Sequence, residues 1–415
     1  MFLLIILAFI LFFDIYFYLG LNSLIKNLSP KRKKAILYSY WGFTLFVIVY
    51  MLTALAVPSQ HWPLFIRVYV TSVIIIVTVS KIFACIILLI DDIIRIFRWS
   101  ASAILKSTSK KEQPVENITR VSRLKFLNQF AFILAAVPFI SMFYGMFKGA
   151  FEYTIRTNRM TFPGLPKAFD GLKIIQISDI HCGSFYSTDP VQRAVNIINS
   201  QKADMVFFTG DLVNDFAYEI ERFTSILSQI KAPMGVFSVL GNHDYGDYPR
   251  WESKEDKIKN FISLVNTQKS MGWDLLRNEN RIIEKNGEKI AIVGVENFAR
   301  TTRNPRYGDL GKALIGTEGI PFKLLLSHDP YHWSEEVIKD YPKVNMTFSG
   351  HTHGMQFGVE IPGIKWSPVQ YIYEQWAGLY QKGRQYIYVN RGLGFIGYAG
   401  RVGILPEITV HEFHQ

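Results

Sequence analysis

Cysteine is scarce in this chain of 415 residues, which contains only two. Cys85 lies inside a long apolar run and Cys182 lies beside His181, so we expect no disulfide between them and infer no redox compartment. Charge is also scarce, because Asp, Glu, Lys and Arg make up 19% of the residues whereas 49% are hydrophobic. No internal repeat or low-complexity tract is visible. These features exclude an ordinary small soluble domain and predict a membrane part joined to a globular part.

The charge is unevenly distributed along the chain. Residues 1–150 contain 16 Lys and Arg but only 5 Asp and Glu, so the whole formal net charge of +11 lies in this part. A basic protein can be a nucleic-acid binder, but here the excess basic residues flank apolar runs and the rest of the chain is formally neutral. We therefore expect no nucleic-acid partner.

Four apolar stretches are long enough to cross a bilayer, which requires about 20 mainly apolar residues. They predict an all-α transmembrane region of four helices over residues 1–150, followed by a globular domain over residues 151–415. The first stretch lacks a basic leading region and a small-residue cleavage site, so we expect a retained helix and not a cleaved signal peptide. The predicted spans are approximately residues 2–21, 35–57, 64–90 and 126–147.

The basic residues between the spans predict the orientation. They concentrate in segments 22–34 and 91–125, whereas segment 59–63 has none. By the positive-inside rule both basic segments are cytoplasmic, and an even number of spans places the globular domain outside the cytoplasm. We expect a multi-pass protein of the cytoplasmic membrane. Within the second basic segment, residues 106–121 are polar and contain Pro114, which predicts a flexible loop.

Asp14 and Lys81 are charged residues inside the apolar runs, at roughly similar depth. An unpaired charge within a membrane is costly, so we predict that they pair across the first and third helices. The alternative is that each side chain reaches the membrane interface separately.

The pattern changes after residues 161–166, which contain two prolines and a glycine. Short apolar runs of strand-forming residues follow, and residues 191–200, between the first two runs, have helical spacing. This order predicts an α/β domain whose strands end in polar loops. The predicted strands are residues 172–178, 205–209, 235–240, 289–295, 322–327 and 345–348.

Five polar motifs follow these runs, and they contain five of the nine histidines. Each alone is weak, because Gly-Asp and Gly-Asn-His-Asp are common in turns. Together they supply imidazole, carboxylate and amide ligands without sulfur, which suit two ions of Mn²⁺, Fe or Zn²⁺ better than a thiolate zinc site. Two such ions about 3.5 to 4 Å apart can activate water and bind phosphoryl oxygens, so the motifs predict a di-metal phosphoester hydrolase. They are Asp179-Ile-His181, Gly210-Asp211, Gly241-Asn-His-Asp244, Ser327-His328 and Gly350-His-Thr-His353.

The order of these motifs resembles that of the calcineurin-like metallophosphoesterases over about residues 165–412. Residues 165–171, 350–354 and 388–394 are similar to the membrane-attached branch of that family, described as transmembrane proteins with a metallophosphoesterase domain. The resemblance implies a four-layer α/β/β/α sandwich in residues 151–415, with two metals at the sheet edges.

The same resemblance implies the roles of the motif residues. His243 would protonate the leaving oxygen or stabilise charge on phosphorus, and a metal-bridging hydroxide would attack the phosphoester without a covalent intermediate. Asp244 would support His243 or only its loop. One metal would be held by Asp179, His181, Asp211 and His353, and the other by Asp211, Asn242, His328 and His351, with Asp211 as the bridge.

Other polar and aromatic residues leave alternatives open. Asn390 and Arg391 could contact the substrate phosphate or could only order their loop. Five aromatic residues between positions 366 and 380 suit a membrane interface or an acyl-chain groove, or an ordinary packed loop. We expect the remaining histidines to be structural or solvated: His61, His332, His411 and His414.

A hydrolase held in the bilayer meets lipid head groups at high local concentration. We therefore expect a phosphodiester, phosphomonoester or pyrophosphate substrate that is a lipid or is linked to one. The alternatives are a soluble or protein phosphoester, or a non-catalytic membrane sensor or scaffold that keeps the metal site. His243 argues against the scaffold, because a binding-only site needs no proton donor. No oligomeric state is predicted.

Overall fold

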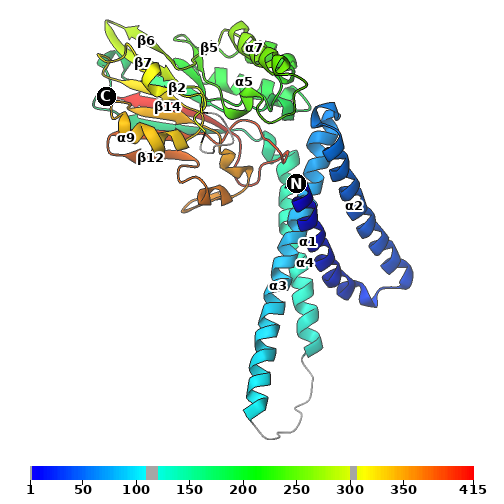
Figure 1. The fold of residues 1–415 in the computed structure, drawn as a ribbon. Helices are drawn as coiled ribbons and strands as arrows, with labels where there is room; N and C mark the ends of the chain where they lie inside the picture. Colours follow the sequence, from blue (N-terminus) through cyan, green and yellow to red (C-terminus); the bar gives the residue numbers. More distant parts are fainter. Residues whose placement is uncertain (1, 109–119, 300–305) are drawn as a thin grey trace. The chain divides into compact units, whose positions relative to one another are not determined.

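The computed structural model describes residues 2–108, 120–299 and 306–415. The chain forms two compact units, Met1–Phe143 and Tyr144–Gln415, and each is described by itself. Figure 1 shows that the first unit is built of helices and that the second contains the sheets.

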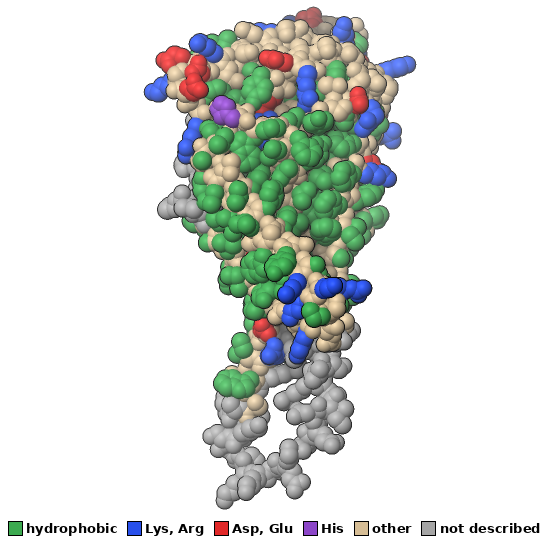
Figure 2. Space-filling model, turned by 90° about the vertical axis from the view of Figure 1, so that its right-hand side faces the viewer, with side chains coloured by type: hydrophobic (Ala, Val, Ile, Leu, Met, Phe, Trp, Pro, Cys, Tyr) green, Lys and Arg blue, Asp and Glu red, His purple; other side chains and the backbone are tan. Residues whose placement is uncertain are grey.

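Four helices of the N-terminal region are long and apolar enough to cross a membrane, as predicted. Figure 2 shows a broad field of hydrophobic side chains with a group of Lys and Arg side chains at its end, a pattern typical of a surface that faces lipid. The helices are α1 (Phe2–Leu24), α2 (Pro30–Ala56), α3 (Thr71–Thr108) and α4 (Arg120–Phe147), and the candidate spans are Ile5–Asn27, Pro30–Ala56, Ile66–Ser102 and Gln129–Phe151.

Helix α3 is longer than the sequence predicted, because it continues past residue 90 to Thr108. Asp92 does not end the helix: its Oδ2 accepts a hydrogen bond from Tyr16 at 2.7 Å, and its Oδ1 binds Arg95 at 3.0 Å. Residues 91–108 are therefore helical and not part of a loop. Of the predicted loop over 106–121, residues 109–119 lie outside the described part of the chain.

The predicted pair between Asp14 and Lys81 is confirmed. Lys81 Nζ lies 2.7 Å from Asp14 Oδ1, and both side chains are buried within the helices. Thr44 donates its hydroxyl to Asp14 Oδ2 at 2.7 Å, and the Lys81 ammonium lies 4.6 Å from the centre of the Tyr40 ring. The carboxylate thus links three helices, because Asp14 is on α1, Thr44 on α2 and Lys81 on α3.

The second unit contains two six-stranded mixed sheets. The first has the order β1-β14-β2-β3-β4-β5 and the second the order β12-β13-β9-β8-β7-β6. The strands of the first sheet are β1 (Thr154–Thr161), β14 (Glu407–His414), β2 (Leu172–Ile177), β3 (Met205–Phe208), β4 (Val236–Ser238) and β5 (Asp274–Leu275). Those of the second are β12 (Gly378–Lys382), β13 (Gln385–Val389), β9 (Met346–Ser349), β8 (Lys323–Leu326), β7 (Glu288–Gly294) and β6 (Glu279–Lys285).

The two sheets pack face to face around the main hydrophobic core, because alternate residues of a strand point to opposite faces. On β7, Ile290 and Ile292 join the core between the sheets, whereas Ala291 and Val293 join a second core on the outer face. Helices cover both outer faces, among them α5 (Asp189–Ser200) and α7 (Lys254–Ser270) beside the first sheet and α8 (Leu310–Ala313) beside the second. The predicted four-layer α/β/β/α sandwich is confirmed.

Strand β14 occupies an internal position although it follows every other strand in the sequence. It pairs in parallel with β1 from Thr154↔Glu407 to Thr161↔His414, and in antiparallel fashion with β2. The first sheet is therefore completed by a strand that is distant in the sequence. Glu412 of β14 lies opposite Arg159 of β1, 253 residues away.

Candidate metal centre

The motif residues lie on the loops that follow β2, β3, β4, β8 and β9, where the carboxyl ends of parallel strands meet. Five of the seven predicted ligands have left-handed backbone conformations, with φ between 50° and 72°. Such conformations cost energy outside glycine, although Asp and His tolerate them better than most residues, and they concentrate at functional sites. The five are Asp179, His181, Asp211, His351 and His353.

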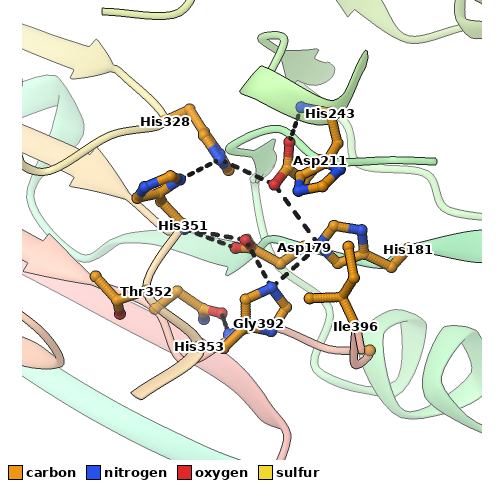
Figure 3. A network of polar contacts seen from close by, with 12 residues as sticks. Asp179, His181, Asp211, His243, His328, His351, Thr352, His353, Gly392 and Ile396 are labelled. Carbon is orange, nitrogen blue, oxygen red and sulfur yellow. Dashed lines mark hydrogen bonds and ion pairs between the residues drawn. The ribbon is translucent and has the colours of Figure 1, made fainter. Parts of the chain in front are cut away.

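Asp179, His181 and His353 form the first group of converging ligand atoms, all of them buried. His353 Nε2 lies 3.2 Å from Asp179 Oδ1 and 3.0 Å from His181 Nε2 (Figure 3). Two imidazole nitrogens this close are favourable only if one carries a proton or both direct lone pairs at a shared cation. Burial lowers the pKa of His181 to about 3, so its imidazole is neutral and suited to binding a metal.

Asp211, His328 and His351 form the second group. His328 Nε2 lies 3.1 Å from Asp211 Oδ2 and 3.2 Å from His351 Nδ1. Asp211 Oδ2 also lies 3.6 Å from His181 Nε2, a ligand atom of the first group. The Asp211 carboxylate therefore lies between the two groups, as Figure 3 shows.

His328 shows that the second group attracts positive charge. Its Nδ1 lies 2.7 Å from the carbonyl of Thr209, to which it donates, so the lone pair of a neutral ring would point at the Asp211 carboxylate. Burial opposes a charged His328, but the attraction of Asp211 outweighs it and raises the pKa to about 10. A proton or a metal ion between these residues would stabilise the close approach of His328 to Asp211, and the Asp and His donors suit a metal ion.

Asn242, which the sequence predicted as a ligand of the second ion, has an unsatisfied oxygen atom. Its side chain is buried, its Nδ2 donates to the Tyr248 hydroxyl at 2.7 Å, and its Oδ1 has no hydrogen-bond partner among the described residues. A buried amide oxygen without a donor costs free energy. A metal ion at the second group would give this oxygen a partner.

His243 is half-exposed at the edge of the centre. Its backbone N donates to Asp211 Oδ1 at 2.9 Å, and its ring Nδ1 lies 2.7 Å from the carbonyl of Asn214. With Nδ1 bound to that carbonyl, Nε2 is the nitrogen left for a substrate. The His243 ring lies 5.0 Å from the His181 ring, so it is close to both groups.

Asp244 supports the loops and not the His243 ring. Its carboxylate accepts hydrogen bonds from the backbone N atoms of Gly241, Asp211, Leu212 and Val213, at 2.8 to 3.3 Å. The sequence left open whether Asp244 supports His243 or only its loop, and these backbone contacts favour support of the loop. Asn214 could not be identified from the sequence, because it contacts His243 through its backbone carbonyl.

The glycines of the motifs allow close packing against the ligands. A Cβ atom on Gly241 would collide with the Asp211 carboxylate, and one on Gly350 would collide with Asp179 and the Ser178 hydroxyl. The Gly-Asn-His and Gly-His-Thr-His patterns therefore have a steric basis at this centre.

Two further side chains contact the predicted ligands from outside. The Tyr373 hydroxyl lies 2.9 Å from His351 Nε2, which fixes the ring so that Nδ1 points at His328. Arg401 Nη2 lies 3.2 Å from His353 Nδ1 and 2.5 Å from the carbonyl of Gly394. A guanidinium donates hydrogen bonds and accepts none. If a metal ion bound His353 Nε2, Arg401 would keep the carbonyl of Gly394 as its acceptor and would no longer bond His353.

Asn390 and Arg391 lie outside both groups. Asn390 is fully buried and donates to Thr409 Oγ1 at 2.9 Å. Arg391 is 2% exposed and binds Glu407 at 2.5 Å and Glu360 at 2.6 Å. These contacts favour the loop-ordering alternative, and a substrate role for the two residues stays a prediction.

Three of the four remaining histidines make contacts that agree with a structural or solvated role. His332 Nδ1 lies 2.8 Å from Ser327 Oγ, His411 is buried beside Gln176, and His414 is exposed near Asp170. The cysteines are both free and buried, and neither belongs to a ligand group.

The sandwich and the two Asp and His groups joined by one carboxylate define the class, which is that of the metal-dependent phosphoesterases. Residues 172–355 match the family model of the calcineurin-like phosphoesterases, and residues 1–150 match a model described as a probable calcineurin-like phosphoesterase transmembrane domain. The chain therefore belongs to the calcineurin-like phosphoesterase family and has a transmembrane domain of four helices.

Curated relatives include proteins from bacteria and vertebrates. The chain is 33% identical to metallophosphoesterase YkuE of Bacillus subtilis over 266 residues, which cover 62% of this chain and 83% of that protein. It is 30% identical to phosphodiesterase YaeI of Escherichia coli, over 58% of this chain and 81% of that protein. It is also 30% identical to a transmembrane protein with metallophosphoesterase domain of Danio rerio, over 59% of this chain but only 54% of that protein.

Proposed function

We propose that this integral membrane protein hydrolyses a phosphoester of a lipid or lipid-linked molecule at a centre of two divalent metal ions. The observation that carries the proposal is the position of Asp211, whose Oδ2 lies 3.1 Å from His328 and 3.6 Å from His181. One carboxylate shared by two ligand groups is the arrangement that a two-metal site requires.

The first ion would be held by Asp179, His181, Asp211 and His353, and the second by Asp211, Asn242, His328 and His351. Bound divalent ions of Mn, Fe or Zn would polarise the phosphoryl group and lower the pKa of the attacking water. The protein contributes a rigid frame, because His328 is fixed by Thr209 and His351 by Tyr373.

His243 would act on the leaving group. Its Nδ1 donates to Asn214, so a proton on Nε2 could pass to the leaving oxygen, or the charged ring could stabilise the negative charge that develops on phosphorus. The half-exposed position of His243 supports this role, because the substrate must reach Nε2 from solvent or from the membrane surface.

The catalytic unit would lie outside the cytoplasm. The basic segment 22–34 between α1 and α2 supports cytoplasmic placement of that turn, which sends α4 outward. A reporter fused after Gln415 that requires an extracytoplasmic environment should be active. Activity only of a cytoplasmic reporter would reverse the orientation.

The first test is Mn²⁺-dependent hydrolysis of bis(p-nitrophenyl) phosphate and of p-nitrophenyl phosphate by the full chain in detergent. His243→Ala should lower kcat by about 10² to 10⁴ while the bound metal is unchanged, because general acid catalysis contributes this much. His414→Ala is the matched control, since His414 is exposed and lies outside the centre.

Activity of wild type and of the His414 variant, with loss in the His243 variant, would support the proposal, and the preferred ester would give the substrate type. Two bound metal equivalents without cleavage of either ester would favour a binding scaffold. A His243 variant as active as wild type would contradict the assigned proton donor.

A further inference from the structure

A short β-hairpin lies outside both large sheets, between the last metal motif and strand β12. It pairs β10 (Val359–Ile361) with β11 (Ile364–Trp366) through a Pro-Gly turn in which Gly363 has φ 82°. Val359 is opposite Trp366, Glu360 opposite Lys365, and Ile361 opposite Ile364. Directly opposed residues share a face, so the hairpin has one apolar face of four residues and one charged face.

Both residues of the charged face contact the protein, Glu360 as a half-buried side chain and Lys365 as an exposed residue whose ammonium reaches back to the domain. Glu360 accepts from Arg391 at 2.6 Å and from Arg156 at 2.7 Å, and its side chain is only 16% exposed. Lys365 donates to the carbonyl of Ala377, and its ammonium lies 4.7 Å from the centre of the Trp376 ring. The two charges therefore hold the hairpin on the domain.

The apolar face is turned outward as a consequence. Ile361 is 55% exposed, Ile364 54% and Val359 42%. In a soluble antiparallel hairpin the apolar face packs on the core and the polar face meets water. The reversed arrangement indicates a surface that meets an apolar environment.

The exposed apolar surface continues toward the metal centre. Trp366 Nε1 donates to the Tyr371 hydroxyl at 3.5 Å, and Tyr371 and Ile372 are 78% and 50% exposed. The next residue, Tyr373, contacts the metal-centre residue His351. We call this surface the apolar rim and define it as Val359, Ile361, Ile364, Trp366, Tyr371 and Ile372.

The base of the hairpin is joined to the membrane end of the same unit. The fourth candidate span ends at Phe151, and within the second unit the carbonyl of Gly145 accepts from the Arg401 backbone N at 3.1 Å. The next residue, Val402, accepts from the Gly358 backbone N at 2.9 Å, and Gly358 immediately precedes β10. The apolar rim is thus continuous, through backbone contacts, with a segment that leaves the bilayer.

We propose that the apolar rim docks on the lipid surface and presents the head group of a membrane lipid to the metal centre. The substrate class is then a phosphoester in a lipid head group, with the acyl chains left in the bilayer. This assignment of substrate rests on the hydrolase function proposed above, whereas docking on lipid does not.

Docking can be measured without activity. Cys85 and Cys182 are buried, so a cysteine placed at Ile364 can be labelled selectively with a polarity-sensitive fluorophore in the full chain. After reconstitution into vesicles of phosphatidylcholine and phosphatidylglycerol, nitroxide groups on the lipid acyl chains should quench this label strongly. The control label at Ile315, which is 69% exposed on the same unit, should be quenched weakly. Equal quenching of the two labels would overturn the docking.

The substrate class is measured with paired phosphodiesters. The lipid probe is a diacylglycerol p-nitrophenyl phosphodiester in the same vesicles, and the soluble probe is bis(p-nitrophenyl) phosphate. The double variant Ile361→Ser with Ile364→Ser should lose about tenfold in turnover of the lipid probe and keep its rate on the soluble probe, because only the lipid needs the docked surface. Ile315→Ser should change neither rate.

The two proposals fail differently. A quenched Ile364 label with no cleavage of either probe by wild type would refute the hydrolase function and leave the docking in place. Cleavage of the soluble probe, with equal loss or no loss on both probes in the double variant, would refute the lipid assignment and leave the hydrolase.

Discussion

Replacement of Asp211 by Asn should affect the two metals unequally. The second ligand group contains Asp211 as its only carboxylate, since its other members, Asn242, His328 and His351, are neutral when they bind metal. The first group keeps the carboxylate of Asp179. Asp211→Asn therefore leaves one site with a negative ligand and the other with none.

The magnitude follows from burial. Asp211 is 2% exposed, and removal of one partner from a buried charge pair costs about 3 to 5 kcal/mol. That free energy corresponds to about two to four orders of magnitude in the dissociation constant of the second metal. The affinity for the first metal should fall less, because that site keeps the carboxylate of Asp179. The Asn side chain can still accept the backbone N–H of His243, which now bonds Asp211 Oδ1 at 2.9 Å, so the loop should keep its conformation.

The assay is calorimetric titration of Mn²⁺ into metal-free protein, with metal content measured by mass spectrometry after gel filtration. Wild type should bind two equivalents, and Asp211→Asn should retain about one at the same free Mn²⁺ concentration. Asp170→Asn is the control, because the Asp170 side chain is 57% exposed and lies outside the centre. If Asp211→Asn bound two equivalents of Mn²⁺ with unchanged affinity, the proposal that both metals share the Asp211 carboxylate would be refuted.

Two further predictions concern buried contacts outside the ligand set. Tyr373→Phe should weaken binding of the second metal by about tenfold, because it removes the hydroxyl that orients His351. Tyr371→Phe is the control and should leave the affinity unchanged. Equal metal-titration curves for the two variants would contradict the orienting role of Tyr373. Asp14→Leu alone should destabilise the helices by about 3 kcal/mol, because Lys81 would be left buried without its partner, and adding Lys81→Leu should restore most of the loss. Thermal unfolding in detergent measures both variants, and a double variant as unstable as the single one would contradict the pairing.

The convergence of six Asp and His side chains in two groups could be expected from the sequence, because these residues are clustered in short motifs. Each motif follows an apolar run, and parallel strands bring their carboxyl ends together, so the sequence predicts that Asp179, Asp211 and His328 lie close to one another. The strands that carry them were also predictable, since β2, β3 and β8 are continuous apolar runs.

The contacts that orient the ligands were not predictable in the same way. Tyr373 and Arg401 are distant in sequence from the histidines they contact, and Asn214 acts through its backbone. The outward direction of the apolar face of the β10–β11 hairpin depends on Arg156 and Arg391, which bind Glu360 from other parts of the chain.

The length of helix α3 was underestimated from the sequence. The sequence predicted that the third span ends near residue 90, yet the helix continues to Thr108, and Tyr16 and Arg95 bind Asp92 within it. Helix length depends on such side-chain partners as well as on hydropathy.

The internal position of β14 also sets an order of events during biosynthesis. Strand β1 emerges from synthesis soon after α4, but its partner β14 follows it by 253 residues at the Arg159 and Glu412 pair. At about 5 to 20 residues per second, the first sheet stays incomplete for roughly 10 to 50 s while its unpaired edges are exposed. The membrane helices have time to insert before the catalytic unit can close, so the nascent chain is anchored while the edge of β1 is still free to pair incorrectly.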